Sequence, residues 1–344
     1  MPVLDSLGMF DLVETMPEQV HAAVIASRGL TGLPAAEEVE HVVMLGMGGS
    51  GIAGDMLVAA ATPLLPVPVV VSKSYELPAF IGEGSLVFAV SVSGNTEETI
   101  QAASDAAVAG AHMVVVTGGG ELGLLARSWG VPIVPVPPDI PQPRAAFGAV
   151  AIPPLVVLDE IGLLKGAATW IDAAVDQLRR RRDQLAQAGD ASEAAEVARR
   201  IGATIPLIQG SGGIGSAAAV RWRTQINENA KSPAFSSTQP ELCHNEVCGW
   251  GTRGEITRSG FTVVQLRHDE EHPQIERRFD FTRDLLDQAV ADVIEVHAEG
   301  DGELAQLLDL VLFGDYVSLW MAAAAGVDPG PVDVLVELKR RLSS

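Results

Sequence analysis

Two short segments of the sequence combine glycines with hydroxyl side chains and could hold an anion. Residues 46–51 read GMGGSG and residues 91–96 read SVSGNT. Glycines let the backbone turn tightly and direct N–H groups at an anion, and a helix that follows adds the positive end of its dipole. The candidate phosphate-binding residues are Gly49, Ser50, Ser91, Ser93 and Thr96. The alternative role for Thr96 is that of a helix N-cap.

The glycine spacing also matches the dinucleotide pattern G-x-G-x-x-G, first at residues 46–51 and again at residues 210–215. That fingerprint calls for an acidic residue about 20 positions further on, where it holds the ribose. Ser72 and Lys73 stand there instead. A small phosphorylated metabolite therefore fits better than NAD, and a reader of the 2′-phosphate of NADP stays open.

Glu228 is the carboxylate best placed to move a proton. It lies between Asn227 and Asn229, near the end of a helix expected over residues 214–231. The negative end of the helix dipole disfavours a charge there, and partial burial would bring such a group toward the neutral pKa that a general base needs. On composition alone an ordinary surface glutamate is the more common case.

His244 is the candidate proton carrier among seven histidines, because Asn245 and Glu246 follow it in an irregular segment. The alternative is a metal site with Cys243, His244, Glu246 and Cys248 as its ligands. The C-x₄-C spacing of the cysteines is not that of a zinc pair and the chain has no second pair, so we expect no metal.

Two cations complete the set of candidate residues. Arg144 follows the last expected strand of the first half, where a loop would face a ligand. Lys339 lies on the closing helix of a chain that otherwise prefers arginine, and a lysine can release a proton where an arginine cannot. A lysine that only complements the helix dipole is the alternative for Lys339.

Runs of β-branched residues alternate with helical segments in both halves of the chain, which predicts parallel sheets covered on both faces. The strands are expected at residues 41–47, 67–72, 86–92, 112–117, 131–136, 205–209, 261–267 and 293–297. The helices are expected at residues 52–61, 96–109, 121–129, 214–231, 273–287, 304–326 and 333–342. Because each half opens with strand, glycine loop and helix, we predict two copies of one doubly wound unit.

Residues 151–201 are expected to be entirely helical. They contain the arginine run 179–182, which we interpret as a solvated helix face because the chain as a whole is acidic.

Length and charge exclude several classes of protein. The 344 residues are 47% hydrophobic and carry a formal charge of −21, so the chain is not disordered and repels nucleic acid and anionic membranes. Two cysteines and no visible signal peptide fit a reduced cytoplasm. Residues 304–326 are interpreted as a buried helix rather than a membrane span, because they include polar residues.

Taken together, the motifs resemble the bifunctional phosphoglucose/phosphomannose isomerases, from about residue 18 to the C-terminus. The matching segments are residues 46–55, 91–98, 143–148, 227–231, 244–246, 314–316, 328–329 and 338–339. The resemblance implies two sugar isomerase (SIS) domains, each an α/β/α three-layer unit, at residues 18–155 and 201–344, with a helical connection at residues 156–200. It also implies interconversion of glucose 6-phosphate, mannose 6-phosphate and fructose 6-phosphate through an enediol.

The same resemblance implies a role for each candidate residue. Glu228 would shuttle the proton, Arg144 would stabilise the enediolate, and His244 with Lys339 would open the sugar ring. The five residues of the two loops would hold the phosphate. It further implies a homodimer in which His244 reaches the partner's site, and no metal or other cofactor. The alternative from a different class is a sugar phosphate sensor that does not turn over its ligand.

Overall fold

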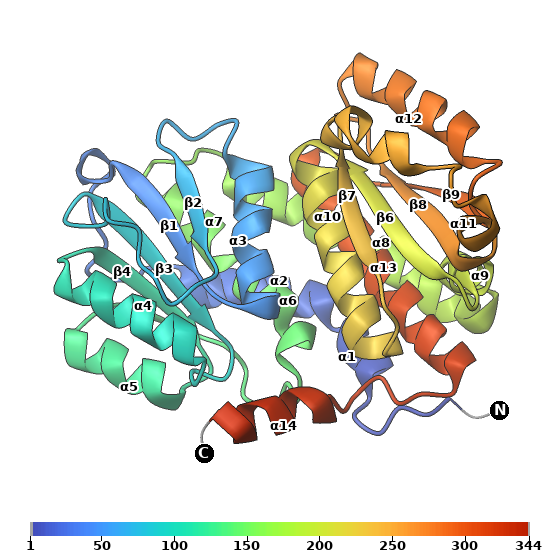
Figure 1. Cartoon of the computed structure of the whole chain (residues 1–344). Helices are drawn as coiled ribbons and strands as arrows, with labels where there is room; N and C mark the ends of the chain where they lie inside the picture. Colours follow the sequence, from blue (N-terminus) through green and yellow to red (C-terminus); the bar gives the residue numbers. More distant parts are fainter. Residues whose placement is uncertain (1–2, 343–344) are drawn as a thin grey trace.

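The computed structural model describes residues 3–342, which form two parallel β-sheets, one in each half of the chain (Figure 1). The first sheet has the order β2-β1-β3-β4-β5 and the second the order β7-β6-β8-β9. The first sheet consists of β1 (His41–Leu45), β2 (Val69–Ser72), β3 (Ser85–Ser91), β4 (His112–Thr117) and β5 (Ile133–Pro135). The second consists of β6 (Ile205–Ser211), β7 (Phe235–Gln239), β8 (Phe261–Arg267) and β9 (Asp292–His297).

Side chains that alternate along the strands bury both faces of each sheet, as the continuous apolar runs predict. In β3, Val87 packs in a cluster with α4 and α5, whereas Phe88 packs with α3 and α6. In the second sheet, Val263 packs with α12 and Val264 joins the same large cluster as Phe88. The predicted fold class, two doubly wound units of three layers each, is confirmed.

Some helices alternate with the strands, and others follow one another at the start of the chain, between the two sheets and at its end. Those of the first half are α1 (Met9–Glu14), α2 (Met16–Ser27), α3 (Gly48–Ala61), α4 (Glu97–Val108), α5 (Gly120–Trp129), α6 (Phe147–Ala151) and α7 (Pro153–Glu160). Those of the second half are α8 (Ala167–Ala188), α9 (Glu193–Ile201), α10 (Gly212–Gln225), α11 (Gly254–Gly260), α12 (Pro273–Leu286), α13 (Glu303–Ala325) and α14 (Asp333–Leu342).

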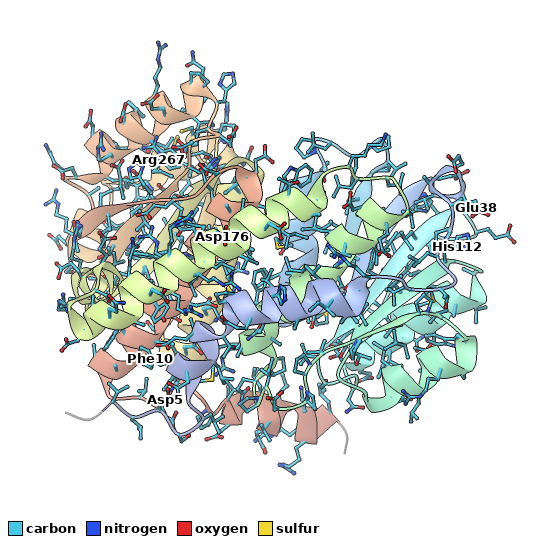
Figure 2. The ribbon with its side chains drawn as sticks, turned by 180° about the vertical axis from the view of Figure 1, so that it is seen from behind. Asp5, Phe10, Glu38, His112, Asp176 and Arg267 are labelled. Atoms are coloured by element: carbon cyan, nitrogen blue, oxygen red, sulfur yellow. The ribbon has the colours of Figure 1, made fainter. Side chains whose placement is uncertain are left out.

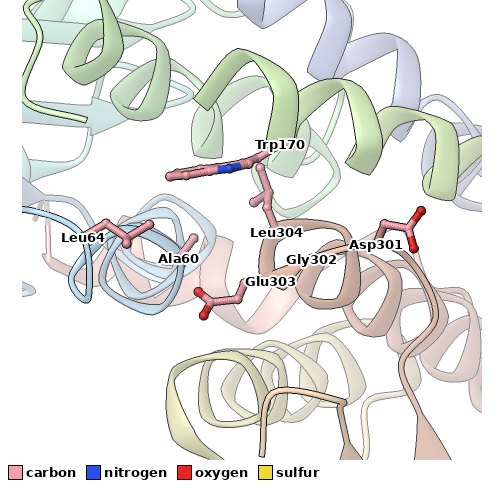
Figure 3. Close-up of a pocket in the computed structure, with 7 residues that line it drawn as sticks. All are labelled: Ala60, Leu64, Trp170, Asp301, Gly302, Glu303 and Leu304. Carbon is pink, nitrogen blue, oxygen red and sulfur yellow. The ribbon is translucent and has the colours of Figure 1, made fainter. Parts of the chain in front are cut away.

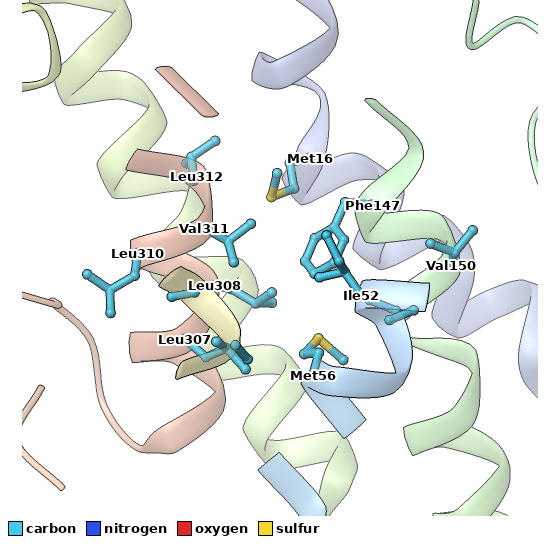
Figure 4. Packing of buried hydrophobic residues seen from close by; sticks show 14 of the residues in the cluster. Met16, Ile52, Met56, Phe147, Val150, Leu307, Leu308, Leu310, Val311 and Leu312 are labelled. Atoms are coloured by element: carbon cyan, nitrogen blue, oxygen red, sulfur yellow. The ribbon is translucent and has the colours of Figure 1, made fainter. Parts of the chain in front are cut away.

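One continuous core joins the two halves. Ile52 and Met56 of α3 face Leu308 and Val311 of α13 across it, with Phe147 between them (Figure 4). By length and composition α13 is apolar enough to cross a membrane, but 83% of its most apolar window is buried inside the protein. The expectation of a buried core helix over residues 304–326 is therefore confirmed.

The segment between the two sheets is not one continuous helix, which corrects the expectation for residues 151–201. Gly162, Gly166 and Gly189 adopt positive φ angles of 84°, 92° and 54°, a conformation that ends helices, and they separate α7, α8 and α9. Helix α8, which carries Asp176, crosses the back of the molecule (Figure 2) and packs with α9 against α13.

The arginine run on α8 is not wholly a solvated face, which is a second correction. Arg181 is buried, and its Nε lies 2.9 Å from Asp309 Oδ1 on α13 while its guanidinium covers the Phe313 ring at 5.2 Å. Its three neighbours in the run are exposed or partly exposed, as expected. A helical face that meets a buried carboxylate explains the exception, since a buried carboxylate needs a charged partner.

Candidate active site

The first predicted loop connects β1 to the N-terminus of α3. Gly48 has a φ of 53°, and Gly49 and Ser50 form the first turn of the helix. A side chain at Gly46 would place its Cβ 3.1 Å from the carbonyl oxygen of Val90, a tight contact that would push the loop away from β3 by a few tenths of an ångström. The amides of Gly48 and Gly49 precede the first hydrogen-bonded turn, where Ser50 N donates to Met47 O (3.1 Å). The loop therefore presents N–H groups to an anion.

The second predicted loop follows β3, the sheet neighbour of β1, so the two loops adjoin at the carboxyl edge of the first sheet. Thr96 occupies the N-cap position of α4 but makes no side-chain cap; its hydroxyl lies 3.0 Å from Ser91 Oγ instead. Ser91 Oγ accepts from Gly94 N (3.1 Å), and the exposed Ser93 Oγ accepts from Asn95 N (3.2 Å). Ser93 therefore keeps its O–H free to donate to a ligand, and the hydrogen bond between Ser91 and Thr96 uses only one of their two O–H groups.

Antiparallel packing of two helices brings Glu228 to the first loop. At Gly213, the start of α10, an added Cβ would lie 2.8 Å from Ala59 Cα, near the end of α3. The two helices pack along each other, so the C-terminal end of α10 lies beside the N-terminal end of α3. There α10 continues into a π-helical turn, η4 (Ile226–Ala230), which carries Glu228.

Arg144 joins this turn to the first loop. It lies in the short helix η2 (Pro143–Ala146), and an added Cβ at Gly49 would be 3.4 Å from Arg144 Cα. Its guanidinium Nη1 lies 3.5 Å from Glu228 Oε2, and its Nε donates to Asn229 Oδ1 (2.7 Å). Arg144 is only 2% exposed, whereas the Glu228 side chain is 28% exposed. The structure therefore brings together a glycine loop, a buried cation and a carboxylate that solvent can reach.

A buried ion pair holds Arg144 in place. Arg221 of α10 donates to the carbonyl of Arg144 (2.7 Å) and binds Asp315 of α13 with two hydrogen bonds of 3.0 and 2.8 Å. Burial raises the pKa of Asp315, against the effect of Arg221. Burial also lowers the pKa of Arg144, with a smaller opposing effect from Glu228.

Sequence reasoning assigned no role to the two residues that support Arg144 from α10 and α13. The available signal was that Arg221 follows the apolar run at residues 217–220 and Asp315 follows the apolar run at residues 310–313, because charged residues are rarely buried without a partner.

The structure leaves His244 and Lys339 at the surface. His244 is exposed on η5 (Glu241–His244), which follows β7 at the edge of the second sheet. Lys339 is exposed on α14, and this helix lies across the lower edge of the first domain (Figure 1).

The two cysteines of the alternative metal site have different surroundings. Cys243 Sγ donates to Gln239 Oε1 (3.1 Å) and Cys248 is exposed. Among residues 3–342, no three His, Cys, Asp or Glu side chains are grouped as a metal site would require.

An apolar cavity of about 160 Å³ lies at the opposite end of α3. Trp170, Leu304 and Leu64 line it together with the backbone turn at Gly302 (Figure 3). A helix of 14 residues spans roughly 20 Å, so this cavity is remote from the loop at the start of α3.

Comparison with known proteins identifies the family. A model of the bacterial phospho-glucose isomerase C-terminal SIS domain matches residues 190–342, and a model of the SIS domain matches residues 37–128. The bifunctional phosphoglucose/phosphomannose isomerase of Caldicellulosiruptor bescii is 35% identical over 97% of this chain and 99% of its own length. The protein of the same name from Aquifex aeolicus is 35% identical over 88% of this chain and 90% of its own.

The solved structures support the fold. A putative phosphosugar isomerase from Clostridium difficile 630 superposes with a TM-score of 0.75, at 15% identity, over 96% of this chain and 97% of its own. At that identity the likeness shows the architecture alone, whereas the full-length matches at 35% identity carry the assignment. The chain belongs to the bifunctional phosphoglucose/phosphomannose isomerase family.

Proposed function

We propose that this chain is an isomerase that interconverts glucose 6-phosphate and mannose 6-phosphate with fructose 6-phosphate. The observation that carries the proposal is the Glu228 carboxylate, 3.5 Å from the buried Arg144 and beside the glycine loop at residues 46–51. The relatives that match over nearly the full length carry the name of this activity.

The two loops would bind the phosphate. Backbone amides at the start of α3, with Gly49 and Ser50, face the same edge of the sheet as Ser91, Ser93 and Thr96. Two helix N-termini and several hydroxyl donors suit a dianion and fix the orientation of the sugar. A net charge of −21 opposes approach of an anion, so this local supply of donors and the Arg144 cation is needed.

Glu228 would remove the proton from the carbon next to the carbonyl and return it to the neighbouring carbon. In the open-chain aldose the proton leaves C2 for Glu228 and the electrons pass through C1 to the carbonyl oxygen O1, which gives the enediolate. A proton then moves from the C2 hydroxyl to O1, and return of the Glu228 proton to C1 re-forms the carbonyl at C2, which gives the ketose. Arg144 would stabilise the negative charge that develops on O1, because a cation fixed before the reaction has no reorganisation cost. Glucose and mannose differ only at C2, so one enediolate protonated on either face leads to both aldoses.

His244 and Lys339 would open the sugar ring, with His244 reaching the site of a partner subunit. The exposed position of His244 is consistent with that role. Helix α14 carries an exposed apolar stripe of Val334, Leu338 and Leu342, which are 77%, 52% and 69% exposed. An exposed apolar surface of this kind supports a homodimer, because contact with a partner subunit would bury it. We also propose that the protein is cytoplasmic and that its domains divide at residues 18–155, 156–200 and 201–344.

The test is to incubate the purified protein with fructose 6-phosphate after exhaustive chelation and to follow the products by NMR. We expect both glucose 6-phosphate and mannose 6-phosphate to appear. Binding without any conversion would favour the sensor alternative, and activity lost on chelation but restored by zinc would favour a metal at Cys243, His244 and Cys248.

A further inference from the structure

We infer that Lys231 is a positioning residue that ties the turn carrying Glu228 to the connector at residues 326–332, which leads into α14. The inference rests on the proposed isomerase activity, because Lys231 would act through Glu228. It adds a residue to which no catalytic or binding role has been given above.

The backbone of Lys231 marks it as unusual. It follows directly after η4 and has a φ of 55° and a ψ of 28°, the left-handed region. Among residues 3–342 it is the one non-glycine residue with a positive φ. Glycine or asparagine ordinarily occupies this position after a helix, because a β-carbon disfavours the conformation. A lysine here indicates that its side chain contributes something that glycine cannot.

The side chain of Lys231 spans two elements that are distant in sequence. Its Nζ donates to the carbonyl of Glu228 (2.5 Å) and to the carbonyl of Pro329 (3.2 Å). The first bond closes the turn that holds the candidate base. The second bond fixes the connector that leaves α13, 98 residues further along the chain.

Arg144 holds the same carbonyl from the other side. Its Nη2 donates to Pro329 O (2.5 Å) and to Gly330 O (2.8 Å), while its Nη1 faces Glu228. Lys231 and Arg144 thus both donate to the carbonyl of Pro329, and these three residues form a clasp that holds the connector. Since α14 begins three residues after Gly330, the clasp links the helix of Lys339 to the turn of Glu228.

The surroundings of Lys231 disfavour the charged form of its side chain. Burial, and after it the neighbouring Arg144 charge, lowers the pKa of the Lys231 ammonium. The negative charges of Asp328 and Glu228 oppose this effect. Two cations around one carbonyl are unfavourable unless carboxylates and carbonyls surround them, as they do here.

The experiment compares wild type with Lys231→Gly in the full-length protein. Glycine suits the left-handed backbone, so this variant removes the ammonium without straining the turn. We expect kcat to fall roughly 10–100-fold through misplacement of Glu228, with KM for fructose 6-phosphate within about twofold and no loss of thermal stability. Lys231→Asn, which also tolerates this backbone, should behave alike, and the exposed Lys165→Met serves as the control.

Hydrogen exchange supplies a readout that does not depend on activity. We expect faster amide exchange at residues 326–342 in both Lys231 variants, because the connector loses its hydrogen bond from Lys231 to the Pro329 carbonyl. Unchanged exchange there, or wild-type kcat in a folded Lys231→Gly protein, overturns the inference. If the wild type itself lacks isomerase activity the proposed function fails, and the exchange comparison still decides whether the clasp exists.

Discussion

The carboxyl edges of the two sheets share one backbone plan but carry different chemistry. Strand β1 lies between β2 and β3, and β6 lies between β7 and β8, so each is flanked by the next two strands of its own half. Each leads through a glycine loop into a helix of 14 residues. The fifth position of the loop is Ser50 in the first half and the buried Ile214 in the second. At this fifth position the hydroxyl is therefore present in the first half only.

The second loops differ still more. Where the first half has the hydroxyl-rich residues 91–96, the second has His-Asp-Glu-Glu-His at residues 268–272. A cavity of about 490 Å³ lies there, lined by Ser211, Glu270, Glu271 and Arg278 among others. Ser211 Oγ already donates to Glu271 (3.2 Å), which also binds Arg267 (2.8 Å). Carboxylates repel phosphate, so this edge does not repeat the chemistry of the first.

The second half contributes the candidate base instead, from the far end of its helix. Glu228 lies 16 residues after the first residue of α10, and the same count from the start of α3 falls on Leu64. Leu64 lines the apolar cavity of Figure 3, near Trp170. On the proposed function, the duplicated fold yields one reaction site because the first half supplies the phosphate donors and the second half supplies the carboxylate.

Among the substitutions that test this difference between the halves, we expect removal of the Glu228 carboxylate to have the largest effect on activity. For Glu228→Gln we expect a kcat loss on the order of 10²–10⁴ with binding of the sugar phosphate retained, because the amide cannot accept the proton. Steady-state kinetics and calorimetric titration measure the two quantities. Near-normal turnover would show that Glu228 is not the base and that the second half does not supply the catalytic carboxylate.

A serine from the carboxyl edge of each sheet, Ser93 in the first and Ser211 in the second, gives a comparison with a smaller expected effect. We expect Ser93→Ala to raise KM for fructose 6-phosphate roughly tenfold, the effect of one lost hydrogen bond to a charged group. Ser211→Ala should leave KM within about twofold, because its partner is Glu271 rather than substrate. Equal effects of the two substitutions would show that both edges bind sugar phosphate.

The smallest expected effect concerns the number of sugar phosphate sites, because we expect no second site in the second half. Titration of the Glu228→Gln protein with fructose 6-phosphate should give one site per chain, since Glu270 and Glu271 line the cavity at the second edge. A second site with millimolar or tighter affinity would contradict the comparison.

The sequence was sufficient for the parallel sheets and the two glycine loops, because apolar runs and glycine spacing are local signals. It did not predict β7, a short strand with the polar sequence FSSTQ whose pairing with β6 supplies what its composition lacks. It also missed the burial of Arg181, since the partner Asp309 lies 128 residues away. The pairing of Arg144 with the Glu228 turn likewise depends on how α3 and α10 pack, which no local pattern encodes.

Solvent deuterium exchange shows whether the Glu228 carboxylate moves the proton. Fructose 6-phosphate incubated in D₂O with the wild-type protein should gain deuterium at C1, because the base exchanges its proton with solvent between the two transfers. The Glu228→Gln protein should bind the sugar phosphate and leave C1 unlabelled over the same period. Labelling by Glu228→Gln at the wild-type rate would show that a group other than this carboxylate moves the proton.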